Sequence, residues 1–106
     1  MEPLERIKFL RNWREAFSKL DLSEFKEVYV FGSVVTGKVT GGSDIDVILV
    51  ISKEKDRTRA LLDFFDEVEK KLGEDKSYLF DVKVIYEDEK ELPPFRSFLK
   101  DAVKIK

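Results

Sequence analysis

The sequence contains no histidine and no cysteine. Without histidine, the chain cannot use Ser–His–Asp catalysis, an imidazole general base or a histidine-ligated metal. Without cysteine, it has no thiol nucleophile, thiolate zinc site, iron–sulfur cluster or disulfide. Catalysis would therefore depend on carboxylates, lysine, tyrosine, serine and backbone groups. A carboxylate site favours a hard divalent cation, Mg²⁺ or alternatively Mn²⁺.

The chain also lacks a large excess of either charge and a long apolar run. Its 20 Lys and Arg residues are balanced by 22 Asp and Glu, for a net charge of −2. Because nucleic acids are bound by clustered basic side chains, we expect no stable nucleic-acid binding. The longest apolar run, Val47–Ile51, is far shorter than the roughly 20 residues that span a bilayer. The first residues, Met1–Arg6, carry acids where a signal peptide carries cations, so the sequence predicts a cytoplasmic protein with no membrane association.

Hydrophobic periodicity predicts three helices in one domain that spans residues 1–106. The first has a stripe at spacings of three or four residues, made of Leu4, Ile7, Leu10, Trp13, Phe17 and Leu20. The second begins with Ser52 or Asp56 as its cap, continues through Leu61, Phe64, Phe65, Val68 and Leu72, and ends at Gly73. The third begins at Pro93-Pro94 and carries Phe95, Phe98, Leu99, Ala102 and Val103.

Runs of β-branched and aromatic residues predict strands at 28–31, 44–51 and 79–86. The second run is almost continuously apolar, which is typical of a central strand covered on both faces. Helices and strands follow one another along the chain in an order that predicts an α/β (α+β) fold. We expect Trp13, Phe95 and Phe98 in the core, with an interface to a partner or to a second copy in a homo-oligomer as the alternative.

Residues 32–43 hold four of the five glycines and predict a flexible or tightly turning connection with one helical turn at Val34-Val35. Gly32-Ser33 lies where a strand ends, and there glycine lets the backbone approach a ligand and its N–H groups face an anion. Taken alone, Gly-Ser after a strand is usually only a turn. The segment is not a P-loop, since no Gly-Lys-Ser/Thr follows at the required spacing.

Asp44 and Asp46 are two residues apart on a predicted strand, so both carboxylates project from one face. Two carboxylates this close repel each other, and a divalent cation between them would relieve the repulsion. The alternative is that they mark the exposed start of the strand, with Ser43 and Asp44 as turn residues.

Asp81 lies within the apolar run from Leu79 to Ile85, where aspartate is uncommon. If this strand neighbours the strand of Asp46, a third carboxylate joins the same cation site. The alternative is an edge ion pair between Asp81 and Lys83, which are also two residues apart and on one face.

The spacing Gly-Ser-x₁₀-Asp-x-Asp, formed by Gly32-Ser33 and Asp44-Ile45-Asp46, resembles the signature of the nucleotidyltransferase superfamily that includes DNA polymerase beta. The short chain looks like a minimal nucleotidyltransferase of the MNT group, and the resemblance extends from about residue 28 to residue 86. It implies a nucleotidyltransferase-like fold, with a small mixed sheet of three to four strands and helices packed on it.

The resemblance also implies roles for individual residues. Gly32 and Ser33 would hold the β- and γ-phosphates of ATP or another nucleoside triphosphate. Asp44 and Asp46 would ligate two Mg²⁺ ions, and Asp81 would hold the metal that activates the attacking hydroxyl. Where many relatives carry an arginine after Gly-Ser, this chain has Lys38, which would serve as a point charge for the triphosphate.

Minimal nucleotidyltransferases of this kind are typically paired with a small helical HEPN-type toxin. The resemblance therefore implies an antitoxin that transfers AMP to a hydroxyl of that toxin, a tyrosine in particular. The alternative is a binding module that neutralises its partner by contact alone. A small hydroxyl compound is a further alternative acceptor, and a nucleic-acid polymerase is disfavoured because the chain has no basic groove.

Overall fold

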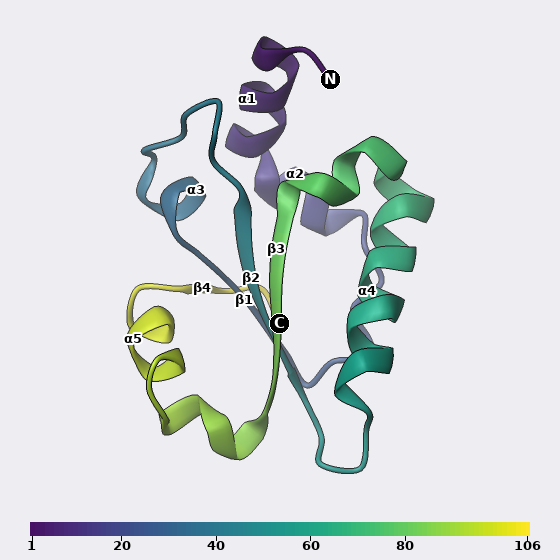
Figure 1. Cartoon of the computed structure of the whole chain (residues 1–106), viewed down its shortest axis with the longest axis vertical. Helices are drawn as coiled ribbons and strands as arrows, with labels where there is room; N and C mark the ends of the chain where they lie inside the picture. The colour runs from purple at the N-terminus through teal and green to yellow at the C-terminus, as the bar shows by residue number, and fades with distance from the viewer.

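Strand β2 (Ile45–Ile51) is the centre of a four-stranded mixed sheet in the computed structural model, which describes all 106 residues (Figure 1). It pairs in parallel with β3 (Phe80–Tyr86) and antiparallel with β1 (Glu27–Phe31). A short strand, β4 (Val103–Lys104), pairs antiparallel with β1, which gives the order β3-β2-β1-β4. The expected α/β (α+β) fold with a small mixed sheet is confirmed.

One face of the sheet packs against helices α1 (Pro3–Arg11), α2 (Trp13–Ser18) and α4 (Arg57–Leu72). In α4, Asp56 is the N-cap and its side chain accepts a hydrogen bond from the Thr58 N–H. The helix ends at Gly73, whose φ of +108° favours glycine. Phe64 of α4 and Phe17 of α2 pack side by side in the core, and Trp13 is buried as expected.

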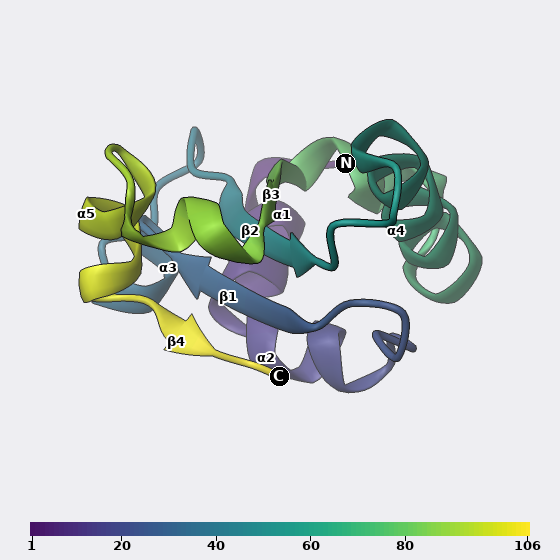
Figure 2. The same ribbon diagram turned by 90° about the horizontal axis from the view of Figure 1, so that it is seen from below.

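The opposite face, called the α5 face below, contains Tyr29, Phe31, Asp46, Ile48, Val50, Asp81, Lys83 and Ile85, as the alternation of side chains along β1, β2 and β3 requires. Figures 1 and 2 show α3 (Ser33–Thr36) and α5 (Phe95–Lys100) on this side of the sheet, away from α4. Phe95 and Phe98 pack against Ile48, Val50 and Ile85. Phe98 also stacks on Phe31, the register partner of Asp46, so α5 packs beside the end of the face that carries Asp46 and Asp81.

The first predicted helix is wrong as a single element, because the chain leaves helical geometry at Asn12. The Asn12 side chain donates to the Lys8 carbonyl at 3.0 Å, a local bond of the kind that competes with helix continuation. Leu4, the first residue of the predicted apolar stripe, is 69% exposed.

The last predicted helix is too long. It ends at Lys100, and Val103 lies instead in β4, where it pairs with Val30 of β1. The free edge of β1 offers unpaired backbone groups, and the β-branched Val103 suits a strand there. Two 3-10 segments, η1 (Glu74–Leu79) and η2 (Glu87–Glu91), flank β3. None of the helices combines the length and the apolar composition that crossing a bilayer requires.

Candidate active site

A row of three side chains crosses the α5 face at one end of the sheet. Phe31 of β1 is the register partner of Asp46, and Asp46 is the register partner of Asp81. The neighbouring residues Ile45 and Phe80 point into the core, so both carboxylates point away from it. The condition set by the sequence, that the strand of Asp81 neighbours the strand of Asp46, is met.

Asp46 is the half-buried member of the pair. Burial raises its pKa above the ordinary value, and the negative charges of Asp81 and, less strongly, Asp44 act in the same direction. The ammonium group of Lys83 opposes them. The ionised form of Asp46 would therefore gain from an added cation.

Gly32 brings the Gly-Ser turn against Asp46. Its φ of +84° lies in the region that favours glycine, and a Cβ placed on it would overlap Oδ2 of Asp46 and lie 3.2 Å from the Asp46 Cγ. Ser33 begins α3 directly afterwards, and the amides of Ser33 and Val34 have no acceptors inside a helix of four residues. The fold thus brings the free amides of Ser33 and Val34 close to the carboxylate of Asp46, which lies more than ten residues later in the sequence.

Asp44 is held apart from this pair. It precedes β2, as the alternative interpretation expected, and its Oδ1 accepts a hydrogen bond from Nη2 of Arg6 at 3.1 Å. The same Nη2 donates to the Ser43 carbonyl at 2.8 Å. No three acidic side chains converge closely enough to form a metal-binding group. The structure brings Asp46 and Asp81 together and places Asp44 on Arg6, a residue the sequence analysis did not select.

Asp81 also has the partner that the alternative interpretation named. Its Oδ2 lies 3.6 Å from the Lys83 ammonium, which is 5.8 Å from the ring centre of Phe31 and 5.7 Å from that of Phe98. The two rings are stacked with their centres 4.9 Å apart. Lys83 therefore lies between an aromatic pair and the carboxylates, and it belongs to the site as a charged neighbour.

Lys38 follows α3 and the left-handed Gly37. Its backbone N–H donates to the Ser33 carbonyl at 3.0 Å, while its side chain is exposed and forms no ion pair. The backbone bond ties the residue to the Gly-Ser turn and leaves the ammonium free in solvent.

These residues fit a divalent cation. Carboxylate oxygens are the ligands that Mg²⁺ and Mn²⁺ prefer, and Asp46 and Asp81 present them from adjacent strands. The absence of a Cβ at Gly32 keeps Oδ2 of Asp46 accessible beside the turn. Asp44 does not converge with this pair in the structure, although its Oδ2 accepts no hydrogen bond from the protein.

We expect replacement of Lys83 by Met to destabilise the metal-free protein slightly. The substitution removes the positive charge beside Asp46 and Asp81 while keeping an apolar chain beside the stacked rings of Phe31 and Phe98. Because Lys83 and Asp81 are partly exposed, the loss should be under about 1 kcal/mol. Urea unfolding in EDTA measures it, and the Lys83→Met, Asp81→Asn double-mutant cycle isolates the pair. A cycle with no coupling would contradict an energetic link between the two residues.

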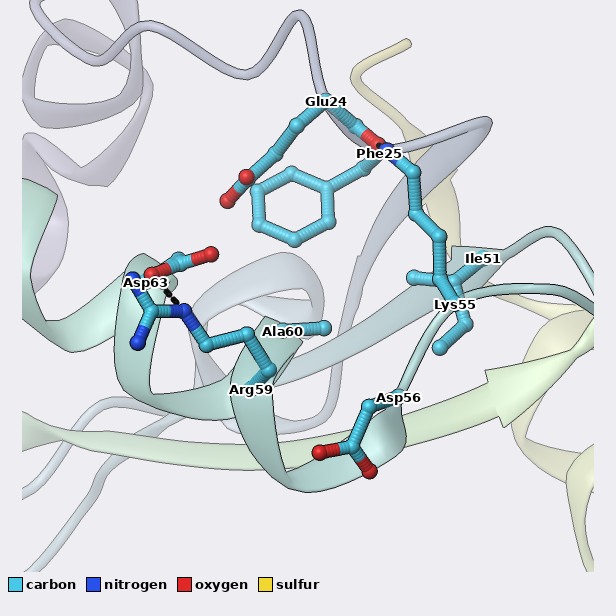
Figure 3. A pocket seen from close by; sticks show the side chains of 8 residues that line it. All are labelled: Glu24, Phe25, Ile51, Lys55, Asp56, Arg59, Ala60 and Asp63. Atoms are coloured by element: carbon cyan, nitrogen blue, oxygen red, sulfur yellow. Dashed lines mark hydrogen bonds and ion pairs between the residues drawn. The ribbon is translucent and has the colours of Figure 1, made fainter.

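The structure's cavities lie elsewhere. One of about 210 Å³, shown in Figure 3, is lined by the apolar side chains of Phe25 and Ala60 and by the acidic residues Glu24 and Asp63. Burial and the charge of Asp63 raise the pKa of Glu24, while Arg59 pairs with Asp63 at 3.2 Å. Ile51, at the other end of β2, also lines this cavity. It is about 16 Å from Asp46 along the strand, so this cavity is separate from the Asp46–Asp81 pair.

Comparison with known proteins gives a family match and a similar solved structure. The family described as nucleotidyltransferase domain matches residues 10–105. A solved structure from Sulfolobus solfataricus, of a protein proposed to be a nucleotidyltransferase, is 26% identical in sequence and superposes with a TM-score of 0.49. The similarity covers 93% of this chain and 80% of that one. No curated protein matches the sequence.

Proposed function

This chain belongs to the nucleotidyltransferase domain family, and on that premise we propose that it transfers AMP from ATP to a hydroxyl group of a partner protein. Nucleotidyl transfer is the activity of the family. The nucleotide, the acceptor and the biological role are the parts that we propose. The observation that carries the proposal is the contact of Gly32 with Asp46, since it sets a turn rich in backbone donors against a carboxylate pair.

In this proposal the Gly-Ser turn binds the triphosphate. The free amides at the start of α3 and the Ser33 hydroxyl donate to phosphate oxygens, and the exposed ammonium of Lys38 adds positive charge. Asp46 and Asp81, with Asp44, would hold two Mg²⁺ ions, with Mn²⁺ as a substitute. Bound there, the metal would offset the negative charge that develops during transfer.

The proposed reaction is an in-line displacement. The acceptor oxygen forms a bond to the α-phosphorus, the bond from that phosphorus to the bridging oxygen breaks, and pyrophosphate leaves. The acceptor hydroxyl loses its proton, and Asp81, the more exposed of the paired carboxylates, would accept it. No histidine is required.

The open position of the carboxylates supports a macromolecular acceptor. None of the cavities is lined by Asp44, Asp46 or Asp81, so the site offers no enclosed pocket for a small hydroxyl compound. A flexible segment or protruding side chain of another protein can reach an open face directly. We propose a small helical HEPN-type toxin as this partner and one of its tyrosines as the acceptor, with this chain as the antitoxin.

Neutralisation by contact alone is the competing function. It is favoured by the ion pairs of Asp44 with Arg6 and of Asp81 with Lys83, since a protein without a metal site could keep these carboxylates as surface pairs. The two functions differ in whether protection of the partner needs ATP. The predicted cytoplasmic location and self-association stay predictions.

The test first asks whether an adjacent gene encodes a small helical protein, and then follows label transfer to that protein after co-expression and co-purification with this chain. We expect label from [α-³²P]ATP to appear on the partner with Mg²⁺ and to be lost with EDTA. Label from [γ-³²P]ATP should not appear, since pyrophosphate leaves, and mass spectrometry should locate one AMP on a tyrosine. Protection of the partner without ATP and without label would favour neutralisation by contact.

A further inference from the structure

Arg6 reaches the site from a part of the chain that precedes the family match at residues 10–105. It lies on α1, which Figure 1 shows next to the ends of β2 and β3. Its Nη2 donates to Oδ1 of Asp44 at 3.1 Å and to the carbonyl of Ser43 at 2.8 Å. One guanidinium nitrogen thus fixes both the end of the Gly-rich segment and the first of the three carboxylates.

These contacts are poorly suited to a purely stabilising role. The Nε of Arg6 is buried and has no hydrogen-bond partner, an arrangement that weakens the folded state. Asp44 is 45% exposed, and an ion pair with such an exposed carboxylate contributes little to folding. Leu10 is the one buried residue of α1, so the first turns of this helix are held weakly by the core.

We propose that Arg6 is a positioning residue for Asp44 in cation binding, an inference that rests on the proposed function. The guanidinium holds Oδ1, while Oδ2 accepts no hydrogen bond from the protein and stays available to a divalent cation. Carboxylate ligands of metals are generally oriented in this way by a partner outside the coordination sphere. The bond to Ser43 fixes the backbone that precedes Asp44, which limits the directions that the carboxylate can take.

The test compares Arg6→Gln with Arg11→Gln, a matched control on the same helix whose side chain is exposed and forms no ion pair. Binding of Mn²⁺ alone is followed by the electron paramagnetic resonance of the free ion. We expect Arg6→Gln to weaken Mn²⁺ binding about 10-fold or more, and Arg11→Gln to leave it unchanged. Hydrogen exchange of the metal-free protein should speed up at residues 41–45 in Arg6→Gln alone.

Arg6→Lys is the second variant, and it tests the role of Arg6 in Mn²⁺ binding if Arg6→Gln does not fold. A lysine keeps the charge but lacks the planar guanidinium, so binding should be intermediate. Wild-type affinity in both variants, or tighter binding in Arg6→Gln, would overturn the proposal, because Arg6 would then be a bystander or a competitor of the cation. Asp46→Asn serves as the reference: if it binds Mn²⁺ as the wild type does, the proposed metal site itself fails, independently of Arg6.

Discussion

Replacement of Gly32 by Ala is expected to reduce nucleotidyl transfer at least 100-fold and to destabilise the fold by about 1–3 kcal/mol. Two effects combine at this position. The φ of +84° disfavours any side chain, and the new Cβ would overlap Oδ2 of Asp46. Relief of the overlap requires either the Gly-Ser turn or the Asp46 carboxylate to move, which separates the backbone donors from the carboxylate pair.

Substitutions at two other glycines of the same segment distinguish backbone strain from the overlap with Asp46. Gly37 has a φ of +81° but nothing within 4 Å of its Cβ position, so Gly37→Ala should be destabilised by backbone strain and lose little transfer. Gly41 has neither a positive φ nor a neighbour, so Gly41→Ala should be neutral or slightly stabilising. Transfer of labelled AMP and urea unfolding are measured on all three variants.

We expect transfer activity to be highest in Gly41→Ala, somewhat lower in Gly37→Ala and far lower in Gly32→Ala. Equal loss in the Gly37 and Gly32 variants would mean that backbone strain alone explains the defect. A Gly32→Ala protein with normal transfer would show that the contact with Asp46 has no part in catalysis.

Local patterns were sufficient to predict the central part of the fold. The apolar run at residues 47–51 predicted a covered central strand, and β2 is buried at every one of these positions. The stripe from Leu61 to Leu72 and the cap at Asp56 predicted α4 closely. In each case the residues of one segment are sufficient for the prediction. A strand buried on both faces needs apolar residues throughout, and a helix buried on one side needs them along one stripe.

Elements that depend on distant partners were not predictable in this way. Strand β4 exists because β1 has a free edge, which the residues around Val103 do not reveal. The contact of Arg6 with Asp44 joins residues 38 positions apart, and no local pattern marks a single arginine on an amphipathic helix. Lys83 was visible as a partner of Asp81, but its position over Phe31 and Phe98 depends on how α5 returns to the sheet.

Replacement of Asp46 by Asn is expected to abolish transfer while leaving the metal-free protein as stable as the wild type or more stable. Asp46 is half-buried beside Asp81, feels the charge of Asp44 less strongly and has no ion pair of its own, so a neutral amide of the same shape removes repulsion. Asp81→Asn is the less clear test, because it also removes the ion pair with Lys83. Asp66→Asn, at an exposed position of α4 without an ion pair, is the matched control.

The difference in stability between Asp46→Asn and the wild type should depend on pH. The folded protein raises the pKa of Asp46 above the ordinary value of 3.8, so it binds this proton more tightly than the unfolded chain does. Well below pH 3.8 the group is protonated in both states and Asp46→Asn should match the wild type. As the pH rises through the folded-state pKa, the wild type should lose stability relative to the variant, and the difference should then stay constant.

Thermal unfolding in EDTA across this range, together with label transfer at neutral pH, decides the role of Asp46. A stable variant without transfer shows that the carboxylate serves the reaction and opposes the fold, as expected for a group placed to receive a cation. A variant that unfolds at lower temperature than Asp66→Asn would mean that the Asp46 carboxylate stabilises the sheet. A variant with full transfer would remove Asp46 from the site, and with it the argument that the Gly32 contact holds the reacting groups together.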